Sequence, residues 1–257
     1  MRLWRIDAFL IAAVLLLPLS AAAAAQAPLS CMPFAGERMT FAVGWEFINA
    51  GTATMAVSHR GAHVYRIDTL AKTNKFFDLF KKVRDTIVSE GLCRGDRAQS
   101  TVFDLTQHEN TYHAVKKTRF LWQRGKVEYT HDGKTDTYDV PAGYLNVMDA
   151  FYTVRRLPLK VGEVLRLPVF DSGKKYDVEV HVLKTEYLYM QGSNGTGKRI
   201  PCLVIEPRLK TAGIFSSVGT MKIWLSDDAR RLPIQMKAKI KIGHIVARLI
   251  GYQPAPR

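Results

Sequence analysis

Cysteine is scarce in this chain of 257 residues, which contains only Cys31, Cys93 and Cys202. The sequence therefore has no CxxC redox pair, and the spacings match no zinc-binding pattern. We expect no metal site, and one disulfide with one remaining thiol in an oxidising compartment. Three pairings are open. A meander of strands would bring Cys31 and Cys93 to one end of the first sheet, so this pair is favoured.

Catalytic and cofactor motifs are also missing. There is no GxSxG elbow and no GxGxxG loop, and the seven histidines form no set with zinc-ligand spacing. Residues 192–198 match the start of a phosphate loop, but Arg199 replaces the required Ser or Thr and a predicted strand follows. That segment is better explained as a hairpin turn, as is Asp171-Ser172-Gly173. The sequence thus predicts no catalytic residue and no cofactor.

Long apolar runs are absent except near the N-terminus. Arg2 and Arg5 precede an apolar run that Pro18 interrupts, and small residues follow it, as in a secretory signal peptide. A spanning helix needs about 20 consecutive apolar residues, which disfavours an anchor. The predicted signal is residues 1–25, cut between Ala25 and Gln26, with a site after Ala27 nearly as good.

The predicted mature chain is one domain, residues 26–257, which is located in the periplasm and does not span the membrane. A lipoprotein is disfavoured, because Cys31 lies too far behind the apolar run and Leu29 is misplaced for a lipid-attachment motif.

Acidic residues are outnumbered, 23 against 37 basic ones, for a net charge of +14. This excess favours polyanionic partners. Export excludes nucleic acid and leaves anionic lipid head groups, glycolipids or acidic envelope polymers. An alternative is that the charge serves solubility alone.

Period-two alternation of apolar residues is the strongest structural signal, beginning with Met39, Phe41, Val43 and Trp45. Helical spacing interrupts it only at about 145–157. The sequence predicts a mainly β fold, a curved antiparallel sheet or partly open β-barrel with one packed amphipathic helix. It also predicts a strand from Ile234 to Leu249 with a β-bulge at Gly243, where the alternation changes parity.

Aromatic residues stand in two predicted connections. Phe76, Phe77 and Phe80 lie between two strands, and Phe215 lies in a Gly/Ser-rich loop. Such residues either plug an open barrel end or line an apolar pocket. They are the candidate ligand-binding residues.

Three segments together resemble the bacterial family called domain of unknown function 3108. They are an opening strand with a Gly-Glu and an Ala-Gly-Thr-Ala turn (Phe34 to Ala53), a helix with the following strand start (Asp149 to Glu163), and a closing hairpin (Ile223 to Gly243). The resemblance implies an exported envelope protein of Gram-negative bacteria. It brings no activity and no catalytic residues.

These observations rank three functions. A non-catalytic binding module for an anionic amphiphile, such as a lipid or glycolipid, comes first. A scaffold that binds an envelope protein is the alternative, and an enzyme acting on envelope polymers ranks last.

Overall fold

The computed structural model describes residues 30–46, 48–191, 197–209, 220–241 and 243–255. The strands are β1 (Arg38–Trp45), β2 (Ile48–His59), β3 (Val64–Thr73), β4 (Arg84–Arg94), β5 (Arg97–Glu109), β6 (Tyr112–Leu121), β7 (Lys126–His131), β8 (Lys134–Asp139), β9 (Val164–Asp171), β10 (Lys174–Gln191), β11 (Gly197–Leu209), β12 (Met221–Ser226), β13 (Pro233–Lys239) and β14 (His244–Gln253). The helices are α1 (Val147–Arg156) and the short 3-10 turns η1 (Phe77–Leu79) and η2 (Trp122–Arg124).

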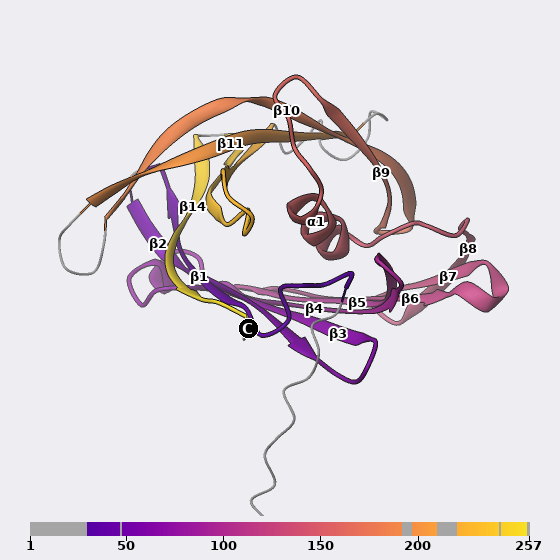
Figure 1. Ribbon diagram of the computed structural model, residues 1–257. Coiled ribbons are helices and arrows are strands. Elements are labelled where there is room, and N and C mark those ends of the chain that lie inside the picture. The colour runs from indigo at the N-terminus through magenta and orange to yellow at the C-terminus, as the bar shows by residue number, and fades with distance from the viewer. Residues whose placement is uncertain (1–29, 47, 192–196, 210–219, 242, 256–257) are drawn as a thin grey trace, which may run out of the picture.

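All fourteen strands belong to one antiparallel sheet, in the order β8-β7-β6-β5-β4-β3-β2-β1-β14-β13-β12-β11-β10-β9. The sheet curves strongly, so that β9, β10 and β11 cross above α1 while β3 to β6 run below it (Figure 1). β8 and β9 are the two ends of the strand order and do not pair, so the barrel is not closed. The predicted mainly β fold with one packed helix is confirmed.

The alternation read in the sequence corresponds to one buried face of the sheet. Met39 and Phe41 of β1 are fully buried, and Tyr65 and Ile67 of β3 join them in the main core cluster. Burying an apolar side chain of this size contributes about 1.5–3 kcal/mol. The central strands therefore have only one register that keeps this face dry.

Helix α1 begins at an N-cap that side-chain chemistry defines. The Asn146 Oδ1 atom accepts hydrogen bonds from the backbone N–H groups of Met148 (2.9 Å) and Asp149 (3.0 Å). This satisfies two of the N–H groups that a helix start leaves free. The helix ends before Pro158, whose ring disfavours helical backbone in the residue before it.

The segment before α1 brings the two halves of the sheet together. The Leu145 backbone N–H donates to the Pro168 carbonyl (3.0 Å), and Phe170 N–H donates to the Leu145 carbonyl (2.9 Å), both on β9. At the end of β8, the other terminal strand of the sheet, the Asp139 carbonyl accepts a hydrogen bond from Lys175 Nζ on β10 (3.2 Å). The open barrel is thus bridged through the connection to the helix.

The predicted single strand from Ile234 to Leu249 is wrong. Two strands occupy this stretch instead of one: β13 pairs antiparallel with β14, and Gln235 faces Arg248. The Ile240 N–H donates to the Gly243 carbonyl (3.1 Å), and Gly243 has φ +75°. A glycine at a parity change is expected both at a bulge and at a turn, so the pattern alone could not distinguish them. A Cβ at Gly243 would also lie 2.5 Å from Glu46 Oε1.

Two further predicted turns lie in this half of the chain. Ser172 and Gly173 have φ +48° and +75° and connect β9 to β10. The predicted turn at residues 192–198 falls mostly outside the described residues. Its flanking strands, β10 and β11, pair antiparallel out to Gln191 and Gly197.

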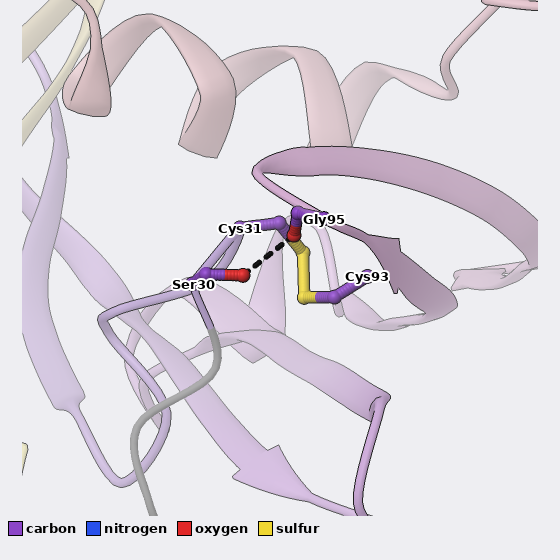
Figure 2. Close-up of a disulfide and its surroundings, with 4 residues drawn as sticks. All are labelled: Ser30, Cys31, Cys93 and Gly95. Atoms are coloured by element: carbon purple, nitrogen blue, oxygen red, sulfur yellow. Dashed lines mark hydrogen bonds between the residues drawn. A yellow bond between two sulfur atoms is a disulfide. The ribbon is translucent and has the colours of Figure 1, made fainter.

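Cys31 and Cys93 form a disulfide, the pair that the strand-order argument favoured (Figure 2). The bond attaches the segment before β1 to the end of β4. The Ser30 hydroxyl donates to the Gly95 carbonyl beside it (Figure 2). Cys202 is a buried free thiol, and burial raises its pKa to about 11.

Candidate functional site

An apolar cavity of about 280 Å³ lies between α1 and strands β9 to β12. Small-molecule sites usually span roughly 300–1,000 Å³, so this one is near the lower limit. Its lining comprises Val147, Ala150, Phe151, Val154, Leu167, Val169, Asp171, Tyr176, Val178, Val180, Ile205, Pro207, Arg208, Leu209, Met221 and Ile223.

The lining follows from the periodicities of the elements. On β10, Tyr176, Val178 and Val180 alternate with residues of the other face, so all three face the helix. On α1, Val147, Ala150 and Val154 lie at spacings of three and four, so they share one helix face. A strand face and a helix face, both apolar, thus enclose a space that hydrocarbon can fill.

Three polar residues are present in this lining. Burial is the main cause of a raised pKa at Asp171, which favours the neutral carboxyl group. The Tyr176 side chain is 94% buried (6% exposed), and its hydroxyl has no hydrogen-bond partner among the described residues. Arg208 is about half exposed and donates to Glu206 Oε1 (2.5 Å). Guanidinium and hydroxyl groups can donate hydrogen bonds to a polar ligand group.

A second set of polar groups is sealed inside the fold at the start of α1. The Asp149 carboxylate is fully buried and accepts hydrogen bonds from the Ser89 hydroxyl (3.1 Å), the Ser100 hydroxyl and Asn146 Nδ2 (2.9 Å). Burial raises the pKa of Asp149 to about 6, against the opposing effect of these hydrogen bonds. Burial and the Asp149 charge also raise the pKa of Tyr65. None of these residues lines the cavity, so the set anchors the helix to β4 and β5.

The predicted ligand-binding residues lie elsewhere. Phe76, Phe77 and Phe80 gather at η1, with ring centroids of Phe76 5.7 Å from Phe77 and 5.5 Å from Phe80. Phe76 is 62% exposed and Phe80 69%, and none of the three lines the cavity. Phe215 lies outside the described residues, as do Ala25 and Gln26 at the predicted cleavage site. Ligand contact by these phenylalanines stays a prediction.

No group of three metal-ligating side chains occurs among the residues that the structure describes. His108 and His113 face each other across β5 and β6 with ring centroids 5.1 Å apart. Across the same described ranges, no helix has the length and hydropathy needed to cross a membrane.

The cavity was missed in the sequence because its residues read as ordinary core. Val178 and Val180 alternate as in the apolar face of any strand, and periodicity does not reveal whether the opposing layer fills the space. The Asp149 cluster carried a weak signal. Asn146 stands three residues before Asp149, as in a capping box with an acidic third residue.

Comparison with known proteins agrees with the architecture. A model of the family described as "Protein of unknown function (DUF3108)" matches residues 40–250, so the chain belongs to that family. Among curated proteins, no significant match to the chain was found.

One solved structure similar to this chain is a crystal structure of a beta-barrel-like protein of domain of unknown function DUF1849 from Brucella abortus. The two share 9% sequence identity with a TM-score of 0.57 over 87% of this chain and 99% of that one. At this identity the likeness concerns the fold alone.

Proposed function

We propose that this protein is a non-catalytic periplasmic binding module that holds one hydrocarbon chain of an anionic amphiphile in the cavity between α1 and strands β9 to β12. The observation that carries the proposal is the cavity itself: thirteen of its sixteen lining residues are apolar. Apolar cavities with a few convergent polar groups are the usual form of sites for small apolar ligands. A volume of about 280 Å³ suits one acyl chain better than a lipid with several.

The polar residues of the lining support an anionic head group. Arg208, which also pairs with Glu206, supplies a guanidinium group, and Tyr176 supplies a buried hydroxyl that has no hydrogen-bond partner among the described residues. A buried hydroxyl without a partner costs free energy that a ligand oxygen would recover. The net charge of +14 would add long-range attraction for anions.

Two observations support the periplasmic location. The N-terminal residues have the composition of a secretory signal. The Cys31–Cys93 disulfide belongs to an oxidising compartment, because cytosolic thiols are normally kept reduced.

A cavity-filling variant tests the site directly. Val178→Phe should fill the space and weaken dodecanoate binding at least about tenfold, as measured by displacement of a fluorescent fatty acid. The phenyl group would occupy the volume that the hydrocarbon chain of dodecanoate fills in the wild type, so the apolar burial of that chain would be lost. The matched control is Val115→Phe on β6, where the side chain is 42% exposed and lines no part of the cavity.

Head-group preference is tested with Arg208→Gln. Dodecanoate should bind this variant more weakly while dodecanol binds it unchanged, since only the carboxylate forms a charge-assisted hydrogen bond. Equal loss for both ligands would reject the head-group assignment.

Unchanged dodecanoate binding by a folded Val178→Phe protein would reject the cavity as the binding site.

The natural ligand is accessible by native mass spectrometry of the protein purified from the periplasm of its own bacterium. An added mass that is released on denaturation would identify the amphiphile. A protein without added mass, together with a specific crosslinked envelope protein, would instead favour the scaffold function.

A further inference from the structure

Exposed apolar side chains lie along one rim of the curved sheet, where the strand ends meet the turns that follow β1, β3 and β5. In this subsection, the edge means this row of strand ends. They are Trp45 (36% exposed), Ile48 (49%), Phe76 (62%), Leu79 (80%), Phe80 (69%) and Tyr112 (49%), and we call them the aromatic rim. None of the six lines the cavity between α1 and strands β9 to β12.

Hydrogen bonds join the three turns into one continuous edge. The Asn74 backbone N–H donates to the Ala50 carbonyl, and Asn74 Nδ2 to the Asn49 carbonyl, each at 2.9 Å. On the other side, Asn110 N–H donates to the Lys82 carbonyl (2.9 Å), and Lys82 N–H donates to Asn110 Oδ1 (2.6 Å). The η1 loop is therefore held by the turns on either side of it.

The apolar residues of this loop are exposed although the loop is well anchored. Asn74 Oδ1 accepts from the Phe77 N–H (2.9 Å), and the Asp78 carboxylate pairs with Arg84 (2.6 Å) and accepts from the Thr73 hydroxyl. None of the η1 residues is buried. The polar side chains thus face the protein, and Phe76, Leu79 and Phe80 are presented outward, the reverse of a normal surface loop.

Basic side chains surround the exposed apolar residues. Lys72, Lys75, Lys81 and Lys82 are all exposed. Of the acidic residues on the same edge, Glu46 bonds to His244 (2.9 Å), Asp78 pairs with Arg84, Glu109 pairs with Lys81 (2.5 Å) and Asp85 accepts from the His108 backbone N–H (3.0 Å). Lys72, Lys75 and Lys82 form no ion pair with a described residue, so the edge presents uncompensated positive charge.

We propose that the aromatic rim docks the protein on an anionic lipid bilayer, with Phe76, Leu79 and Phe80 inserted among the head groups and lysines 75 and 82 beside lipid phosphates. Aromatic and leucine side chains flanked by lysines are typical of segments that lie in a membrane interface. Lysine is depleted at protein–protein interfaces, which disfavours a protein partner. Burial of apolar side chains and attraction to anionic lipids both strengthen the binding of such a segment to a membrane.

Co-sedimentation with vesicles tests this docking. The protein should bind phosphatidylcholine vesicles that contain phosphatidylglycerol, and should dissociate in about 1 M NaCl, where the screening length falls to about 3 Å. The triple variant F76S/L79S/F80S should bind at least about tenfold less, because each lost side chain removes apolar burial. Binding of the double variant K75Q/K82Q should fall about fivefold per lysine.

The matched control replaces three residues of similar exposure outside the rim. Tyr187, Tyr189 and Ile250 are 61%, 68% and 61% exposed, and Y187S/Y189S/I250S should bind vesicles like the wild type. Equal loss in both triple variants, or full binding by F76S/L79S/F80S, would overturn the proposal. If that variant misfolds, the lysine variant and the quenching of Trp45 fluorescence by spin-labelled lipid test the docking instead. Unquenched Trp45 fluorescence together with salt-independent binding would reject it.

The docking proposal does not depend on the cavity. Dodecanoate affinity in solution should be unchanged in F76S/L79S/F80S, and vesicle binding should be unchanged in Val178→Phe. Failure of one proposal is therefore distinguishable from failure of the other.

Discussion

Arg155, near the end of α1, donates two hydrogen bonds to the carboxylate of Glu37, at 2.7 and 2.9 Å, across 118 residues of sequence. Both side chains are buried, and the guanidinium also donates to the carbonyls of Arg230 and Arg231 and lies 4.1 Å from the ring centre of Phe34. One side chain thus joins the segment before β1, the helix and the β12–β13 turn. The pair fixes the position of α1 relative to the sheet, and hence the cavity between α1 and strands β9 to β12.

Breaking this pair should destabilise the protein strongly. Glu37→Gln leaves the Arg155 charge buried without its counter-ion, for which we expect a loss of about 3–5 kcal/mol in the free energy of unfolding. Urea denaturation measures it. Glu37→Gln combined with Arg155→Met should lose less than the sum of the two single changes, because no charge then remains buried. Strict additivity would show that the two residues act independently.

The disulfide should contribute stability through the unfolded chain. It closes a loop with a sequence separation of 62 residues. The chain-entropy relation gives about 4 kcal/mol for a loop of this length. The variant C31S/C93S should therefore unfold at lower urea concentration than the oxidised wild type. A reducing agent should lower wild-type stability and leave C31S/C93S unchanged, and a wild type insensitive to reduction would contradict this.

The fold class was predictable where one face of a strand is buried and the other wet. Met39 and Phe41 show this clearly. β8 could not be found in this way, because Lys134–Asp139 is exposed along nearly all of its length and has no apolar face. It is a strand because it pairs with β7, and pairing at a sheet edge leaves no hydrophobic period in the sequence.

The candidate site was less predictable than the fold. Val178 and Ile205 lie 27 positions apart in sequence, on the consecutive strands β10 and β11, and nothing in either strand shows that α1 leaves a cavity against them. Exposure of Phe76 and Phe80 was equally hidden, because an aromatic residue in a loop reads as buried until its surroundings are known. Both depend on the distance between layers, which a single sequence does not encode locally.

Gly91 on β4 makes room for the ring of Tyr65 on β3. A Cβ at this position would lie 2.2 Å from the Tyr65 hydroxyl oxygen and 3.0 Å from the Gln99 carbonyl. Gly91→Ala should therefore destabilise the protein by about 1–3 kcal/mol through overpacking. Calorimetry would show a lowered Tm. A loss no larger than that of Ala at Gly125, which strains only the backbone at φ +60°, would mean that Tyr65 can move aside.

The buried Asp149 should make stability depend on pH in the opposite sense to a salt-bridged carboxylate. Its pKa is about 6 when folded, against 3.8 for a solvent-exposed aspartate. Between these values the folded state holds a proton that the unfolded state has lost, so stability falls as pH rises from about 4 to 6. Above pH 6 both states are ionised and the contribution is constant. A shift of this size corresponds to about 3 kcal/mol.

The matched variant is Asp149→Asn, which keeps the shape of the side chain and cannot titrate. Urea unfolding of both proteins at several pH values gives the difference in stability between them. This difference cancels the contributions of partly exposed carboxylates such as Glu46 and Asp78, whose pKa values are lowered by His244 and Arg84. The wild type should lose about 3 kcal/mol relative to Asp149→Asn between pH 4 and 7. A difference that stays constant over this range would mean that the hydrogen bonds from Ser89, Ser100 and Asn146 offset the burial of the charge.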